Sequence, residues 1–393
     1  MDSEMRVLFF ISVHGHGRGG HFNSLHHIVN KLSVEHQVGI VSIGPGHSSI
    51  IANNSNFLAH IDFNGINLLQ LKSESDEIVK QFNPEIIHCF DVGCYNIVRL
   101  FYSTKKMKIA LNKCGGPNPK KFPYIKNLVL FSVENKQWFE KDKRYYDANI
   151  ALIPNRVSKI QTTTLDVLKP EGYFSFVRIA RIGKTYKKSI LDSIELIDTL
   201  YESNKKLKLK LFIIGVVECP ETLSEILNNK YVNDGTVRIL TEDKYTIGAS
   251  KMLYLADAVI GTGRGIMEAA SLGLPSLTVN SLSNTPTLIT KDTFDDAFRT
   301  NFSERNVFPG LTKDKNLKEI ETLVSDEEFY QKSSLYTRMM FEQYFDINQA
   351  ENKYTEFYES VATSKKRALL PDAILILNTI YSFFNSSRKT KKV

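Results

Sequence analysis

The stretch from Ala258 to Pro275 constrains the fold of this chain more than any other part of the sequence. It opens with a short apolar run, Ala258–Ile260, which is typical of a buried parallel strand. Three glycines follow, and glycine lets the backbone turn sharply and approach a ligand closely. Residues 264–272 then have helical spacing and end at Gly-Leu-Pro. A strand, a glycine turn and a helix present unpaired N–H groups at the positive end of a helix, so the stretch predicts an anion site.

Glu268 lies about one turn into this predicted helix. A carboxylate there can accept hydrogen bonds from two neighbouring hydroxyl groups, as on a ribose. An ordinary strand–helix turn with an exposed glutamate remains the alternative, because a glycine-rich turn alone is a weak signal.

The first half of the chain has a similar order of elements. We predict a strand at 7–12, a loop rich in glycine and histidine at 14–21, a helix at 22–32 and a strand at 38–43. This order is Rossmann-like, but the loop does not fit the pattern that binds NAD. No cysteine or carboxylate joins the loop histidines at ligand spacing, so a metal site is not predicted. His88 follows a further strand, where a site residue and a buried structural histidine are both expected.

A second Rossmann-like alternation begins at Phe174. The strand Phe174–Val177 is followed by a basic loop that contains Arg181 and Lys188, and then by a helix over 189–200. A basic loop at the carboxyl end of a strand can neutralise a diphosphate. A merely solvated basic loop is the alternative.

Composition limits the class of protein. The 393 residues are enough for two domains, and 42% hydrophobic with 24% charged residues indicates a globular chain. The net charge of +7 favours an anionic partner. Four cysteines lack zinc-like pairing, so we expect a reducing, cytoplasmic compartment. We find no signal peptide and no apolar run of about 18 residues that could span a membrane.

Two basic regions suggest a membrane surface as that partner. Seven lysines (105, 106, 108, 113, 120, 121 and 126) crowd into one region, interleaved with Tyr102, Phe122 and Tyr124. The apolar tail segment 369–384 has basic flanks and is too short and polar to span a membrane. We predict contact of both with anionic lipid, or of the lysines with a lipid-diphosphate acceptor. The alternatives are a solvated face and a helix docked on the protein; nucleic acid is not predicted, because no recognition motif is present.

The central stretch resembles the donor-site motif of retaining, nucleotide-sugar glycosyltransferases of family four. That motif reads Glu-Gly-Phe-Gly, four variable residues, Glu, and then Ala-x-x-x-Gly-x-Pro. The matching residues here are Gly261, Gly263, Glu268, Ala269, Gly273 and Pro275. Thr262 replaces the aromatic residue, and Ile260 replaces the first Glu, which in the family usually contacts the donor sugar.

The resemblance implies roles for residues in both halves. Arg181 and Lys188 would hold the β-phosphate and stabilise its leaving charge, and Glu268 would bind the ribose. Further donor contacts would come from Gly19, Gly20, Gly263, Arg264, Gly265 and Ile266, and the nucleotide base would pack on Leu240 and Thr241. On the acceptor or sugar side we expect His88, from its place at a strand end, and Lys113, which stands near where the family often has a His that touches the donor sugar.

The implied fold class is α/β, with two Rossmann-like domains that face across a cleft (GT-B) and a C-terminal helix that crosses back to the first domain. We expect an acceptor-side domain at 1–165, a donor-side domain at 166–345, the crossing helix at 346–362 and a basic amphipathic tail at 363–393.

The implied function is retaining, metal-independent transfer of a sugar from a nucleotide-diphosphate sugar to a glycan or lipid-linked acceptor, in surface polysaccharide biosynthesis. No cofactor is expected, and we predict a location at the inner face of the cytoplasmic membrane. Two alternatives remain: a nucleotide-sugar isomerase on the same fold, and a catalytically degenerate binding subunit, since Glu is absent at position 260.

Overall fold

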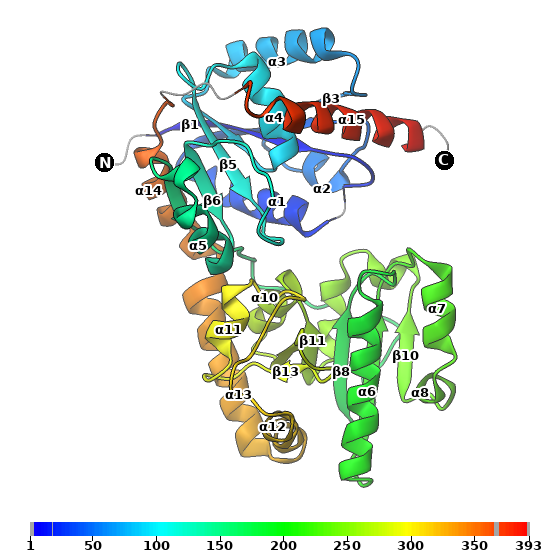
Figure 1. Ribbon diagram of the computed structural model, residues 1–393. Coiled ribbons are helices and arrows are strands. Elements are labelled where there is room, and N and C mark those ends of the chain that lie inside the picture. The colour runs from blue at the N-terminus through cyan, green and yellow to red at the C-terminus, as the bar shows by residue number, and fades with distance from the viewer. Residues whose placement is uncertain (1–3, 18, 365–368, 391–393) are drawn as a thin grey trace. The chain divides into compact units, whose positions relative to one another are not determined.

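The computed structural model describes residues 4–17, 19–364 and 369–390. The chain divides into two compact units. The first comprises the residues up to Arg156 and from Ile347 onward, and the second comprises Val157–Asp346. Each unit is built around one sheet covered by helices on both faces (Figure 1). The predicted fold class of two Rossmann-like α/β domains is confirmed.

The first unit contains a seven-stranded parallel sheet with the order β3-β2-β1-β4-β5-β6-β7. Its strands are β1 Arg6–Ser12, β2 Gln37–Ile43, β3 Phe57–Ile61, β4 Ile86–Cys89, β5 Lys108–Lys113, β6 Asn127–Leu130 and β7 Asn149–Leu152. Its helices are α1 Gly20–Leu32, α2 Ser49–Ala52, α3 Leu68–Phe82, α4 Val92–Phe101, α5 Val133–Lys141, η1 Lys143–Tyr145, η4 Ile347–Gln349, α14 Ala350–Ser360 and α15 Ala373–Thr390.

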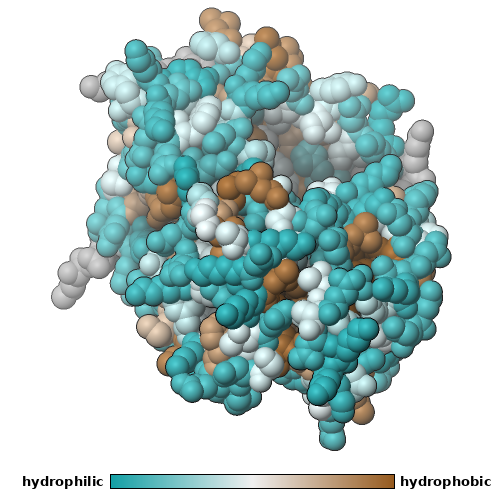
Figure 2. Space-filling model, turned by 60° about the horizontal axis from the view of Figure 1, so that its bottom comes forward, coloured by the Kyte–Doolittle hydropathy of each residue, from teal (hydrophilic) through white to brown (hydrophobic). Residues whose placement is uncertain are grey.

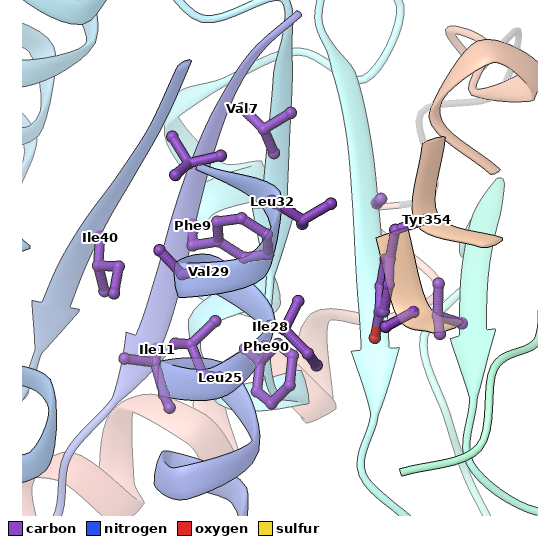
Figure 3. Packing of buried hydrophobic residues seen from close by; sticks show 14 of the residues in the cluster. Val7, Phe9, Ile11, Leu25, Ile28, Val29, Leu32, Ile40, Phe90 and Tyr354 are labelled. Atoms are coloured by element: carbon purple, nitrogen blue, oxygen red, sulfur yellow. The ribbon is translucent and has the colours of Figure 1, made fainter. Parts of the chain in front are cut away.

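Alternating side chains of β1 divide the core of the first unit into two layers. Val7, Phe9 and Ile11 face α1 and α14, and Figure 3 shows them packed against the apolar stripe of α1. Leu8 and Phe10 face the opposite layer, which contains α3, α4, α5 and α15. This near-continuous apolar strand is typical of a parallel sheet buried on both faces.

The second unit contains a six-stranded sheet with the order β10-β9-β8-β11-β12-β13, in which β13 alone runs antiparallel. Its strands are β8 Phe174–Ile179, β9 Leu209–Ile214, β10 Val237–Leu240, β11 Ala258–Gly261, β12 Ser276–Thr278 and β13 Thr287–Leu288. Its helices are α6 Lys187–Ser203, α7 Pro220–Leu227, α8 Lys230–Asn233, α9 Asp243–Thr246, η2 Ala249–Leu255, α10 Arg264–Ser271, α11 Phe294–Arg299, α12 Lys313–Ser325, α13 Glu327–Met340 and η3 Phe341–Phe345.

The boundary between the units lies earlier than the expected position after residue 165. Val157 donates its backbone N–H to the carbonyl of Phe345 (2.8 Å) and is fully buried beside Met267. Val167 is likewise buried in the second unit. These contacts place residues 157–165 with the second unit.

The segment after residue 346 belongs to the first unit. In α14, Tyr354 and Tyr358 are buried in the α1 layer. The tail helix α15 is docked on α4, through a hydrogen bond from Asn96 to Thr379 (3.0 Å) and an ion pair between Arg99 and Asp372 (2.7 Å). The tail therefore has a packed face. Its basic residues 365–367, 391 and 392 lie outside the described residues.

The molecular face shown in Figure 2 is largely hydrophilic, with hydrophobic residues in small, separate groups. Single exposed apolar side chains are normal on a folded protein and need no special explanation.

Candidate active site

The topology of the second sheet places a candidate site at the carboxyl ends of β8 and β11. These strands are neighbours, yet the chain winds outward from them in opposite directions. In open α/β sheets, ligands bind outside the strand ends at such a point. The loop with Arg181 follows β8, and the turn with Gly263 follows β11. The fold thus brings both predicted phosphate segments to one edge of one sheet.

Gly263 gives the turn after β11 its shape. Its φ of +51° is in the left-handed region that favours glycine, and α10 begins at the next residue, Arg264. A Cβ added at Gly265 would meet no atom within 4 Å, so a ligand can approach the backbone there. Ile266 differs from the expectation, because its side chain is only 3% exposed and packs in the core. Its backbone N–H donates to the carbonyl of Gly263 (3.2 Å).

Glu268 and Arg264 form an ion pair across one turn of α10. Arg264 Nε lies 2.7 Å from Glu268 Oε1, and both side chains are mostly buried. The pair holds the carboxylate in one orientation. A ribose hydroxyl group would therefore meet a carboxylate already bonded to a guanidinium.

Arg181 and Lys188 each have an acidic partner. Arg181 lies two residues beyond β8, with its guanidinium 2.8 Å from Glu218 and over the ring of Tyr186. Lys188 is in the first turn of α6 and lies 2.7 Å from Asp192. Both basic side chains stay more than half exposed, at 58% and 62%. They can therefore turn toward a solvent-borne anion without leaving the core.

Leu240 and Thr241 mark the end of β10. Leu240 is 4% exposed and packs with Val177 and Ile214. A base contact through the Leu240 side chain is therefore excluded in this conformation, which corrects the expectation. The half-buried Thr241 follows it at the strand end.

Sequence reasoning missed Arg178 and Glu304. Arg178 is fully buried at the end of β8, and it donates hydrogen bonds to Ile260 O (3.3 Å) and Ser189 Oγ (2.9 Å). Its third neighbour is the carboxylate of Glu304, at 3.9 Å. The available signal was an arginine inside an otherwise apolar strand, because such a charge needs partners from other segments.

The first unit places Gly19 and Gly20 at the start of α1, where both are exposed. Asp91 lies beyond the neighbouring strand β4. Its carboxylate accepts hydrogen bonds from Ser12 N (2.7 Å), Ser12 Oγ (2.8 Å) and Cys94 N (2.9 Å). Burial lowers the pKa of His21, and the charge of Asp91 acts in the other direction. Among the described residues, Ser12, His21 and Asp91 thus give the carboxyl ends of β1 and β4 neutral and acidic groups.

His88 is a core residue. Its side chain is 0% exposed, stacks on Phe9 and bonds through Nδ1 to the hydroxyl of Tyr358 (2.9 Å). Burial lowers the pKa of His88 to about 3, so the ring is neutral. The expectation of an acceptor contact is therefore replaced by the structural alternative.

Lys113 stabilises the loop that follows it. Its ammonium group donates to the carbonyls of Gly115 and Gly116 and to Asn135 Oδ1 (2.9 Å). These bonds give Lys113 a structural role in the loop after β5, and its contact with a sugar stays a prediction. Within the described ranges, no group of three or more His, Cys, Asp or Glu side chains is arranged to hold a metal ion.

Two Rossmann-like units of this topology define the GT-B fold, and comparison with solved structures agrees. HepE of Anabaena in complex with UDP is similar with a TM-score of 0.65 at 13% identity, over 91% of this chain and 100% of that one. A glycosyltransferase of Rickettsia africae gives a TM-score of 0.66 at 16% identity, over 91% and 98%. A putative UDP-N-acetylglucosamine 2-epimerase of Listeria monocytogenes gives 0.57 at 13%, over 93% and 100%. No family model and no curated protein matches the chain.

Proposed function

We propose that the protein is a retaining glycosyltransferase that moves a sugar from a nucleotide-diphosphate sugar to a glycan or lipid-linked acceptor in surface polysaccharide assembly. The observation that carries the proposal is the cluster of Arg181, Lys188 and the start of α10 at one sheet edge. Solved proteins of the same fold are described with UDP and UDP-glucose, which supports a uridine nucleotide as the first donor to test.

The chemistry follows from the charge that leaves the sugar. Cleavage of the glycosidic bond to a nucleoside diphosphate releases negative charge on the β-phosphate. In this proposal Arg181, Lys188 and the positive end of α10 stabilise that charge, which is electrostatic catalysis. In this proposal, basic side chains and a helix end do this work without a metal or a further cofactor, and the leaving phosphate receives the acceptor proton.

Nucleotide binding tests the proposal directly. We expect UDP at about 100 times its Kd to stabilise the protein by roughly 2.7 kcal/mol, and Glu268→Ala to remove this effect because the ribose contact is lost. The measurement is a thermal shift with UDP, GDP and ADP. Glu319→Ala is the matched control, since Glu319 is also an ion-paired residue, four positions from Lys315 on α12.

No shift with any nucleotide, or an undiminished shift in Glu268→Ala, would contradict this assignment. Product analysis then separates two activities. Conversion of one nucleotide sugar into another without an acceptor would indicate an isomerase in place of a transferase.

We also propose that α15 brings the protein to an anionic membrane surface, at the inner face of the cytoplasmic membrane. One side of this helix is docked, with Phe383 fully buried. The other side exposes an apolar stripe at helical spacing, Ile374 (63%), Leu377 (63%) and Tyr381 (63%), and Leu370 (90%) lies in the turn before the helix. None of the helices within the described ranges combines the length and hydropathy that crossing a bilayer requires.

The apolar stripe continues onto α3 and is bordered by basic groups. Gly65 packs against the α15 backbone, and it is followed by Ile66 and Leu69, which are 71% and 86% exposed. Arg388 and Lys389 lie in the last turn of α15. The exposed lysines 105 and 106 are in a loop whose Thr104 bonds to the segment before α15. Apolar side chains with a basic border are typical of helices that lie in an anionic interface.

Binding to lipid vesicles tests this surface. We expect the full chain to co-sediment with vesicles that contain phosphatidylglycerol, and Ile374→Glu with Leu377→Glu to reduce binding about tenfold or more, because charges enter the interface. Leu168→Glu with Leu282→Glu is the control, since these leucines of the second unit are 73% and 79% exposed. Equal loss in both pairs, or no binding by the unmodified chain, would contradict the proposal.

A further inference from the structure

The loop 301–306 of the second unit lies directly against the glycine turn. The N–H of Gly263 donates to the carbonyl of Phe302 (2.8 Å), and Asn301 O is the nearest atom to the position of a Cβ at Gly263. The loop is firmly held. Asn306 is fully buried and donates to Thr278 Oγ1 and Val279 O, both at 3.0 Å.

The backbone of this loop adopts an uncommon conformation. Asn301 and Phe302 both have positive φ, at 58° and 53°, although neither is glycine. Consecutive left-handed residues of this kind cost free energy and persist only where surrounding contacts enforce them. Here the contact is the fully buried ring of Phe302, which packs beside Phe294 and Phe345. The result is a fixed position for Glu304, two residues later.

Glu304 completes a group of charges at the sheet edge. Arg178 joins three segments through its guanidinium: the end of β11 at Ile260, the start of α6 at Ser189, and the loop at Glu304. Arg178 Nε is buried without a hydrogen-bond partner, so this guanidinium is incompletely satisfied. The Glu304 side chain is 40% exposed, which leaves carboxylate surface for another donor.

Position 260, at the end of β11, has no carboxylate, and the carboxylate of Glu304 could take its place. Ile260 is 0% exposed and packs in the core below α6, so it offers a ligand no polar group. Glu304 is the acidic side chain that Arg178 links to that same strand end. A carboxylate is also the acceptor that sugar hydroxyl groups need, since it can receive two O–H bonds at once.

We infer that Glu304 is a specificity-determining residue of the donor site, and that its carboxylate accepts hydrogen bonds from hydroxyl groups of the transferred sugar. This inference rests on the proposed function, because it needs a sugar diphosphate at the same sheet edge. Arg178 is a positioning residue that holds the carboxylate between α6 and the glycine turn.

The test compares a nucleotide with its sugar conjugates. Isothermal titration of the full chain would measure the affinities of UDP, UDP-glucose, UDP-galactose and UDP-N-acetylglucosamine. We expect Glu304→Gln to leave UDP affinity within about twofold and to weaken the preferred UDP-sugar by roughly 10- to 100-fold, the range for hydrogen bonds to a charged group. Glu319→Gln is the control, because burial also raises the pKa of that carboxyl group above its usual range, as it does for Glu304.

If Glu304 has only a structural role, the expected results differ. If it only neutralises Arg178, Glu304→Gln lowers the melting temperature and weakens UDP and UDP-sugar together, and the double variant Arg178→Met, Glu304→Gln restores both. That pattern, or an unchanged UDP-sugar affinity in a folded Glu304→Gln protein, overturns the inference. If the unmodified chain binds neither UDP nor any of these UDP-sugars, the result contradicts the proposed function itself, on which this inference rests.

Discussion

The two units share a topology but have opposite chemistry at corresponding sheet edges. We call the carboxyl ends of β1 and β4 the first edge, and those of β8 and β11 the second edge. The first edge carries Ser12, His21 and Asp91, whose carboxylate is satisfied by backbone and hydroxyl donors. The second edge carries four basic side chains, each with a carboxylate within 4 Å: Arg178, Arg181, Lys188 and Arg264. The same sheet order therefore supports two different kinds of site.

The two units also differ in their histidine content. All nine histidines lie between positions 14 and 88, and residues 157–346 contain none. Groups that titrate near neutral pH are thus confined to the first unit. The second unit relies on arginine and lysine, which stay charged over the physiological range. A permanent positive charge suits a diphosphate, whereas neutral imidazole and hydroxyl groups suit an uncharged acceptor.

Pairing of each cation with a carboxylate explains how the second edge is stable without an anion. Exposed ion pairs of this kind contribute little to stability, about 0–1 kcal/mol. Arg181 and Glu218, whose side chains are 58% and 42% exposed, can therefore separate at small cost when a phosphate arrives, whereas the Asp192 side chain is only 10% exposed and depends more on Lys188. Removal of a cation from the second edge should lower turnover more than stability. Removal of Asp91 from the first edge should lower stability more than turnover.

The largest expected effect separates these two edges. Lys188→Ala should lower the turnover of UDP-sugar to acceptor by about 10²–10³-fold, because a charge that stabilises the leaving phosphate is lost. Its melting temperature should fall less than that of Asp91→Ala, because burial already raises the pKa of Asp192 and the carboxyl group can take up a proton when Lys188 is removed. Asp91→Ala should instead destabilise the fold by about 2 kcal/mol, because α4 loses its N-terminal cap and Ser12 loses a partner. Steady-state kinetics and urea unfolding of both variants provide the two measurements.

Lys205→Ala is the control for Lys188→Ala, since Lys205 is an exposed lysine just beyond the other end of α6. The contrast between the edges breaks down if Lys188→Ala keeps full turnover, or if Asp91→Ala is as stable as the parent protein.

The sequence was sufficient for the order of elements and for the location of the anion-suited turn. Apolar runs with glycine loops identify the buried strands, and the structure then shows that β8 lies beside β11. The places of Arg181 and Gly263 could be predicted in this way because each lies two residues beyond a strand end, whereas their roles in a donor site stay predictions.

Local patterns cannot show which distant segment covers a given residue. Glu304 approaches Arg178 only because the loop 301–306 folds back onto the glycine turn, which the contacts of Phe302 determine. His88 looked equally suited to a site and to the core, and α14 decides the outcome by covering it with Tyr358. The side chains of Leu240, at the end of β10, and of Ile266, on α10, are buried because each faces the core from its own element.

The smallest expected effect is a loss of stability at acidic pH. It should be limited to the first unit, because the histidines lie only there. The pKa of His88 is about 3 in the folded protein, below the ordinary 6.5. Between these values the unfolded chain binds a proton that folded His88 does not, so stability falls as the pH drops below 6.5. From pH 7.5 to pH 5.5 we expect His88 to account for a loss of about 1 kcal/mol. Burial acts on His21 in the same direction.

Hydrogen exchange followed by mass spectrometry can assign this loss to a unit. After correction for intrinsic exchange rates, peptides from β1 and β4 should lose protection at pH 5.5, whereas those from β8 and β11 should not. His88→Leu should weaken the pH dependence in the first unit, and His16→Gln, at an exposed position, should leave it intact. An equal loss of protection in both units would mean that acid acts through groups other than histidine, and the chemical contrast between the edges would then not extend to their response to pH.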